Sequence, residues 1–222
     1  IAPWQSLHGI GRRYLRDPRL LMLLDRYATY TGSDPRRAPA ALASVPWAEQ
    51  SMGSWYVRGG LGRIATALRE RLELLGGAVE TGVEVVEVTT ASGRVDGVRS
   101  ADGTRRRADI VVANADAREV YGRLLAGPRA RRAQARVRRT VPSLSGFVLL
   151  LAVDDPPADV AHHHLLFAED YDDEFDSIFG GHPRPVPRPT VYICAPEDPE
   201  IVPGPGTAAW FVLVNAPRHD PG

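Results

Sequence analysis

The chain has 222 residues, 44% of them hydrophobic, which is enough for one large domain or two small ones. Its 27 acidic and 27 basic residues cancel, so net charge gives no general attraction to nucleic acid or an anionic membrane, and no nucleic-acid partner is expected. Every basic residue is an arginine, which excludes chemistry that needs a lysine Schiff base or a phosphate-loop lysine.

Cysteine content and hydropathy narrow the class further. Cys194 is the single cysteine, so it forms no internal disulfide, and thiols are too few for a cysteine zinc site. The longest apolar run, at residues 147–153, is about a third of a membrane span, so neither a transmembrane helix nor a signal peptide is expected. The chain begins at Ile1 rather than Met and ends without a terminal element, so we expect an interior piece truncated at both ends.

The first 52 residues carry helical signals and no strand signal. Asp17 and Pro18 suit the start of a helix, because Asp accepts backbone N–H groups and Pro tolerates the first turn. Apolar residues then repeat at helical spacing up to Gly32, which favours a stop. Residues 39–50 are alanine-rich and interrupted by Pro46, which predicts a short or kinked helix.

From Ser54 the pattern changes to mixed helix and strand. Gly59 and Gly60 precede an amphipathic helix that runs to about residue 75 and ends at Gly76. Short β-branched runs predict strands at residues 79–81, 83–89, 95–99 and 110–113. Turn signals stand at residues 92–93 and 102–103, and the second suits a type I′ hairpin turn.

The rest of the chain alternates between the two kinds of element. Helices are predicted at residues 117–125, 129–139 and 168–179, and strands at 145–153, 190–194 and 209–214. The apolar composition of residues 145–153 indicates a buried strand. The order of elements predicts a mixed α/β (α+β) fold with mainly antiparallel pairing.

Three features have both a chemical and a structural interpretation. Consecutive histidines at 162–164 point in different directions, so at most two of them share an ion, and no metal site is expected. The basic helix at 129–139 is typical of a solvated face, with lipid headgroups or a partner surface as alternatives. The glycine-rich stretch at 59–62 suits a cofactor edge, although the G-x-G-x-x-G fingerprint after a strand is absent. No catalytic residue is assigned.

Five segments resemble, in order and spacing, the bacterial phytoene desaturase family of carotenoid biosynthesis. They are DRYATYTG (25–32) with RAPA (37–40), WYVRGGL (55–61), ADIVVANAD (108–116), HHHLLF (162–167) with 171–179, and PTVYICAP (189–196) with FVLVNAP (211–217). The Gly-Gly pair recurs throughout flavin amine oxidases, whereas the tyrosine-rich helix end and the His-His segment are more specific to desaturases.

The resemblance implies FAD in a Rossmann-like domain and a long polyene in a tunnel through a mixed-sheet substrate domain. Residues 1–52 would be a helical, membrane-facing part, residues 53–125 part of the FAD-binding domain, and residues 126–222 part of the substrate-binding domain. The protein would be cytoplasmic and peripheral on the inner face of the cell membrane. The family's N-terminal nucleotide fingerprint and C-terminal flavin-contacting segment lie outside this sequence. The chain alone is therefore expected to bind FAD poorly and to be inactive.

Cofactor contacts follow from the resemblance only by matching positions. Val85, with Val83 as the register alternative, matches a valine whose backbone contacts the adenine edge of FAD; its other interpretation is an ordinary strand residue. Ala113 and Asn114 match the strand end that passes close to the FAD pyrophosphate, which is compatible with a plain helix cap by Asp116.

The flavin and substrate end is assigned in the same way. Gly59 and Gly60 would lie near the flavin, and Trp55 and Tyr56 would either line the polyene tunnel or belong to the core. The implied reaction is desaturation of a carotenoid such as phytoene, in which a hydride leaves an allylic carbon for the flavin and the neighbouring carbon loses a proton. Alternatives are a related carotenoid oxidoreductase (a ketolase or another desaturase) and a non-catalytic carotenoid- or lipid-binding module.

Overall fold

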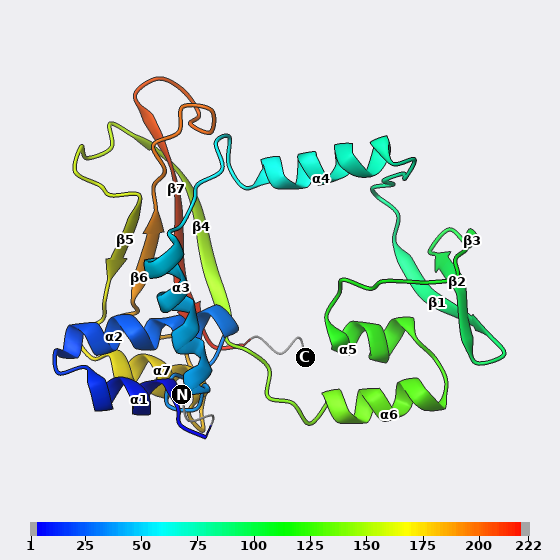
Figure 1. Ribbon diagram of the computed structural model, residues 1–222, viewed down its shortest axis with the longest axis horizontal. Helices are drawn as coiled ribbons and strands as arrows, with labels where there is room; N and C mark the ends of the chain where they lie inside the picture. Colours follow the sequence, from blue (N-terminus) through cyan, green and yellow to red (C-terminus); the bar gives the residue numbers. More distant parts are fainter. Residues whose placement is uncertain (1–3, 219–222) are drawn as a thin grey trace. The chain divides into compact units, whose positions relative to one another are not determined.

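The computed structural model describes residues 4–218, which fall into two compact units (Figure 1). The first unit joins Ile1–Ala67 to Pro142–Gly222, and the second is Leu68–Val141. Helices and two antiparallel sheets confirm the mixed α/β class and the antiparallel pairing. The assignment of parts to cofactor and substrate domains stays a prediction. Among residues 4–218 no helix has both the length and the apolar character needed to cross a bilayer.

The first unit begins with short helices around a small apolar core. They are α1 (Leu7–Tyr14), α2 (Pro18–Arg26), the 3₁₀ turns η1 (Tyr27–Thr31) and η2 (Ala40–Ala43), and α3 (Ser44–Met52). Asp17 caps α2 by accepting the Arg19 N–H at 2.8 Å, and Gly32, with a φ of 61°, ends η1, as the sequence predicts. The buried side chains of the core are Leu7, Ala28 and Ala38.

A four-stranded antiparallel sheet forms the other part of the first unit. Its strands, in sheet order, are β4 (Ser145–Asp154), β7 (Thr207–Ala216), β6 (Val191–Cys194) and β5 (His163–Leu166). Phe147 pairs with Val214 across β4 and β7, and His163 pairs with Cys194 across β5 and β6. The sheet therefore brings the 162–167 and 189–196 segments side by side, although about 30 residues of sequence separate them.

Helix α7 (Tyr171–Phe179) is tied to this sheet by a buried carboxylate. Glu174 is fully buried and accepts hydrogen bonds from the Thr190 N–H at 2.9 Å and from Asn215 Nδ2 at 2.8 Å. Phe175 and Ile178 are buried beside it, as expected for the apolar side of this acidic helix. One side chain thus joins α7 to the start of β6 and the end of β7.

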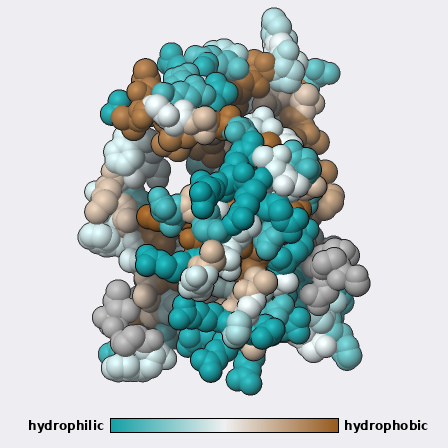
Figure 2. All heavy atoms as spheres, turned by 90° about the vertical axis from the view of Figure 1, so that its right-hand side faces the viewer, coloured by the Kyte–Doolittle hydropathy of each residue, from teal (hydrophilic) through white to brown (hydrophobic). Residues whose placement is uncertain are grey.

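Strand β4 is not the buried strand that its composition indicates. Phe147 is 59% exposed and Leu150 is 79% exposed, so side chains on both sides of the strand reach the surface. β4 is an edge strand that pairs only with β7, and no layer of the described residues buries it. Figure 2 shows, on one face of the molecule, brown hydrophobic side chains at the surface among teal hydrophilic ones.

Two hairpins and short helices form the second unit. The sheet has the order β1 (Val85–Ala91), β2 (Arg94–Ser100), β3 (Arg105–Arg107), followed by α5 (Ala117–Glu119), the π turn η3 (Val120–Leu124) and α6 (Pro128–Val137). Helix α4 (Gly62–Leu74) leads into this unit. It ends in a Schellman motif, in which the Gly77 N–H bonds to the Leu72 carbonyl and the Gly76 N–H to the Glu73 carbonyl.

Three local expectations for this unit are wrong. Residues 79–81 and 110–113 form no strand, and Ile110 is 81% exposed, because no strand within the described residues pairs with either segment. The type I′ geometry, with positive φ at both turn residues, belongs to Ser92 and Gly93 rather than to residues 102–103. At that second turn only Gly103 has a positive φ, and the Gly103 N–H bonds to the Ser100 carbonyl as in a three-residue hairpin loop.

Candidate functional site

The glycine-rich segment before α4 forms a tight turn that favours glycine. The Gly60 N–H bonds to the Val57 carbonyl at 2.9 Å, and Gly59, the third residue of this turn, has a φ of 78°. A Cβ on Gly59 would lie 2.6 Å from Arg63 Nε and 3.0 Å from Glu200 Oε2. The positive φ therefore favours glycine at position 59, and a Cβ there would also require the ends of the Arg63 and Glu200 side chains to shift.

A buried aspartate from the loop between β6 and β7 holds this turn. Asp198 is 3% exposed, and its Oδ2 accepts the Gly59 N–H at 2.6 Å and the Tyr56 hydroxyl at 2.9 Å. Its Oδ1 accepts the Glu200 N–H at 2.9 Å. We call these four residues, Tyr56, Gly59, Asp198 and Glu200, the Asp198 clamp. The clamp joins two segments about 140 residues apart in sequence.

Sequence reasoning missed Asp198. A local signal was present, because Asp198 precedes Pro199 and bonds to the N–H two residues on, which is the pattern of an Asx turn. That pattern explains the bond to Glu200 but does not reveal the contacts with Tyr56 and Gly59. Those contacts depend on how distant parts of the chain pack.

The carboxylate of Asp198 is stabilised in its ionised form. Hydrogen bonds from the Glu200 and Gly59 amides hold its pKa below the ordinary value, with a smaller opposing effect of burial. Burial first, and then the hydrogen bond to Asp198, raise the pKa of Tyr56. Tyr56 therefore remains a neutral donor to a charged acceptor at neutral pH.

We expect the Asp198 clamp to open in acid. A folded-state pKa below that of unfolded aspartate, 3.8, means that the stabilisation is present above that pH and is lost as pH falls through the folded pKa. By NMR, the Gly59 amide proton should shift with a midpoint below 3.8. Asp198→Asn removes the titrating group and should abolish this step. A wild-type midpoint at or above 3.8 would contradict the assignment.

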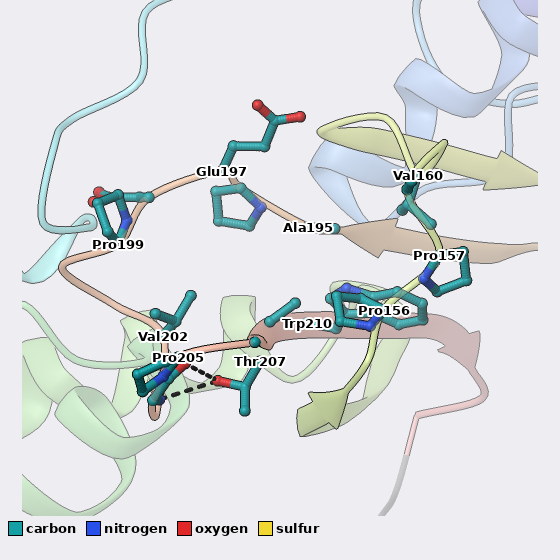
Figure 3. Close-up of a pocket in the computed structure, with 16 residues that line it drawn as sticks. Pro156, Pro157, Val160, Ala195, Glu197, Pro199, Val202, Pro205, Thr207 and Trp210 are labelled. Carbon is teal, nitrogen blue, oxygen red and sulfur yellow. Dashed lines mark hydrogen bonds between the residues drawn. The ribbon is translucent and has the colours of Figure 1, made fainter.

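A mainly apolar cavity of about 740 Å³ lies beside the clamp (Figure 3). The loop after β4 and the loop between β6 and β7 face each other across it, with Trp210 of β7 between them. The apolar lining includes Pro156, Pro157, Val160, Pro199, Val202 and Pro205. Asp198 and Glu197 also line it, but the Asp198 carboxylate is engaged by the clamp. The rigid proline rings give the cavity fixed apolar walls.

Four of the residues singled out from the sequence lie in this part of the first unit. Tyr56, Gly59 and Gly60 are brought together by the turn and the clamp. Trp55 is 82% exposed, so its interpretation as a core residue is wrong. Its assignment to a polyene tunnel, like the other site assignments, stays a prediction.

The other three residues singled out from the sequence, Val85, Ala113 and Asn114, lie in the second unit. Val85 is half-buried at the start of β1 and pairs with Ser100, whereas Val83 precedes the strand. Ala113 and Asn114 are exposed in an irregular segment that leads to α5. Asp116 caps that helix by accepting the Arg118 N–H at 2.7 Å, as predicted. The contacts of Val85, Ala113 and Asn114 with a cofactor stay predictions.

The residues around the turn fit one edge of a nucleotide cofactor. Among the described residues, no heavy atom beyond the neighbouring residues and backbone of α4 lies within 4 Å of the position that a Cβ on Gly62 would take, which leaves room at the start of α4. The N–H groups of Gly59 and Gly60 are already bonded to Asp198 and Val57. The segment therefore suits a peripheral contact with a nucleotide and does not supply the principal phosphate site.

A solved structure shares the fold of this chain. A solved oxidoreductase from Methanosarcina mazei superposes with a TM-score of 0.70 at 19% identity, over 95% of this chain and 47% of that one. Residues 8–199 match the family of flavin containing amine oxidoreductases, and the chain belongs to this family.

Carotenoid enzymes are among its curated relatives. The chain is 34% identical over 220 residues to the 4,4′-diapolycopene oxygenase of Methylomonas sp, covering 98% of this chain and 44% of the relative. It is 37% identical over 219 residues to the hydroxyneurosporene desaturase of Rubrivivax gelatinosus, covering 98% and 41%. The resemblance to carotenoid desaturases is thus confirmed, and the chain spans less than half the length of each relative.

Proposed function

We propose that this chain is part of an FAD-dependent oxidoreductase that desaturates a carotenoid such as phytoene. One observation carries the proposal. The chain belongs to a flavin family and, over nearly its whole length, is 34% and 37% identical in sequence to two carotenoid enzymes. The names of the two relatives refer to different carotenoids. The choice of phytoene as substrate is therefore the most specific part of the proposal.

The proline-lined cavity supports an apolar substrate. A hydrocarbon polyene offers no polar group for recognition, so a site for it needs apolar walls and sufficient volume. The cavity volume of about 740 Å³ falls within the range of about 300–1,000 Å³ that is usual for small-molecule sites. Trp210 and the surrounding prolines supply the apolar surface.

The chain's own residues would orient the reactants. When bound, FAD supplies the acceptor for the hydride that leaves an allylic carbon. Gly59 and Gly60 would form the close-approach edge near the flavin, and the hydrogen bond from the Gly59 N–H to Asp198 would hold this turn. Trp55 and Tyr56 would contact the polyene, while Val85, Ala113 and Asn114 would contact the nucleotide.

The proposal is tested by product analysis in a bacterium that makes phytoene. Expression of the longer protein that contains this chain should yield pigments that have lost two hydrogens per desaturation, as measured by mass spectrometry. The 222-residue chain alone should give no product and should not retain FAD after gel filtration. Absence of product from any carotene supplied would overturn the enzyme assignment, leaving a carotenoid- or lipid-binding module. Stoichiometric FAD retention by the chain alone would contradict its expected inactivity.

Oxygenation of a carotenoid is the second candidate. It is favoured by the match to a protein named as a diapolycopene oxygenase. The same mass spectra separate the two reactions, because a desaturated product loses hydrogen without gaining oxygen, whereas a ketolase or oxygenase product gains oxygen.

Peripheral membrane contact is also part of the proposal. Leu20 and Leu23 of α2 are 51% and 41% exposed, and Tyr30 of η1 is 59% exposed, so apolar groups of the helical part reach the surface. Exposed aromatic and aliphatic side chains of this kind favour the interface of a bilayer. The longer protein should float with liposomes in a density gradient, and failure to float with any lipid would count against this contact.

A further inference from the structure

One end of the β5–β6 pair gathers two histidines and the chain's single cysteine. His163, the first residue of β5, pairs directly with Cys194, the last residue of β6. The Ala195 N–H donates to the His162 carbonyl at 2.8 Å, which extends the pairing by one residue. The ligand atoms of His162, His163 and Cys194 all lie within 4.8 Å of one another.

The position of His162 explains how two consecutive histidines share a side. Within a regular strand successive side chains point to opposite faces. His162 precedes β5, outside the strand, and its ring centroid lies 4.5 Å from that of His163. His164, inside the strand, does not belong to the cluster. Two of the three consecutive histidines thus lie in the cluster, and the third donor comes from the neighbouring strand.

The donor set suits a thiophilic metal ion. Imidazole nitrogen and cysteine sulfur bind Zn²⁺ at about 2.0–2.3 Å, which places donor atoms of a tetrahedral site about 3.3–3.6 Å apart. Movements of about 1 Å, within reach of side-chain torsions, would bring the present arrangement to that geometry. Three protein ligands leave one position for water or a small anion, as in zinc sites that are not purely structural.

Two tyrosine side chains contact the histidines of the cluster. The Tyr192 hydroxyl lies 2.9 Å from His163 Nδ1, and in the tautomer whose Nδ1–H donates to this oxygen, Nε2 has the lone pair that a metal needs. The Tyr56 ring packs edge-on against His162, with centroids 5.2 Å apart. Arg26 is a cation close to this cluster, with its guanidinium carbon 5.0 Å from the Tyr192 ring centroid. A thiolate on Cys194 would offset part of the positive charge that a divalent ion adds beside Arg26.

We propose that His162, His163 and Cys194 bind one divalent thiophilic cation of the zinc class. This departs from the absence of a metal expected from the sequence, and it does not depend on the flavin or on the carotenoid. The site joins the segment before β5 to the end of β6. Bound metal would therefore fasten these two strands to each other.

Cobalt provides the direct test, because Co²⁺ bound to a thiolate gives a charge-transfer band in the near ultraviolet. Titration of the reduced chain with Co²⁺ should saturate at one equivalent with this band, and Zn²⁺ should remove it. Cys194→Ser should abolish the band, and His163→Gln should weaken Co²⁺ binding about tenfold or more. His164→Gln is the matched control, since its ring lies outside the cluster, and it should leave binding unchanged.

A second measurement needs no variant. Zn²⁺ should slow the reaction of the half-buried Cys194 thiol with a disulfide reagent, and urea should remove both this protection and the cobalt band. Absence of a thiolate band at saturating Co²⁺ would overturn the proposal. A band that persists in urea, or that is unaffected by His163→Gln, would overturn it equally, because either result means binding by the thiol without a folded site.

Discussion

Replacing Glu174 by alanine should lower the free energy of unfolding by about 3 kcal/mol. The side chain is fully buried, and its two oxygens accept separate bonds from the Thr190 N–H and from Asn215 Nδ2. Removal leaves two donors without their acceptor and a cavity beneath α7, and unsatisfied buried donors cost about 1–3 kcal/mol each. Urea denaturation followed by circular dichroism measures the change.

Two further variants isolate the cause. Glu174→Gln keeps the size of the side chain and one acceptor oxygen, so it should cost less than alanine. Glu169→Ala removes a carboxylate of a highly exposed ion pair, with Arg188 Nη1 3.8 Å away, and should change stability by less than about 1 kcal/mol. Equal losses for Glu174→Ala and Glu169→Ala would show that the buried hydrogen bonds of Glu174 do not hold α7 to the sheet.

The elements that the sequence predicts correctly are those with local end signals. Asp17 and Gly32 bound the α2–η1 segment where expected, and Gly76 and Gly77 end α4 through two specific backbone bonds. Such caps satisfy orphan backbone groups within a few residues of sequence, so they can be recognised without knowledge of the fold. Helix α1, capped by Ser6 through the Gly9 N–H, carries the same kind of signal and was missed.

Elements that depend on a distant partner are the ones that composition misjudges. Residues 110–113 have the β-branched character of a strand, but strand geometry requires a neighbour to accept and donate its hydrogen bonds. β4 does find a neighbour in β7, yet its leucines remain exposed because burial requires a second layer as well as a strand partner.

The same distinction separates the candidate sites. The glycine turn at 59–60 is visible in the sequence because positive φ selects glycine locally. Asp198 and Cys194 gain their roles from contacts with residues that are distant in sequence, Gly59 in one case and His163 in the other. No periodicity or spacing rule encodes such contacts, so only the folded chain reveals them.

The second large effect is expected at Gly59. Gly59→Ala should destabilise the first unit by about 2–3 kcal/mol, since a φ of 78° alone costs an L-residue about 1–2 kcal/mol. The added Cβ would also push against Arg63 and Glu200, whose ion pair spans 3.0 Å. Urea denaturation gives the stability, and the NMR shift of the residue 59 amide reports whether the bond to Asp198 survives.

Two other glycines of the chain separate strain from crowding. Gly76→Ala meets a similar positive φ, 82°, but open space, so it should cost only the strain, about 1–2 kcal/mol. Gly62→Ala lies in the first turn of α4 with open space and no positive φ, and should be neutral or stabilising by up to about 1 kcal/mol.

Combining Gly59→Ala with Asp198→Asn tests the coupling between the two residues, because the glycine should matter less once the charged acceptor is gone. Equal costs for Gly59→Ala and Gly76→Ala, with no coupling to Asp198, would mean that glycine at 59 is needed only for its backbone conformation and that the Asp198 clamp does not fix the turn.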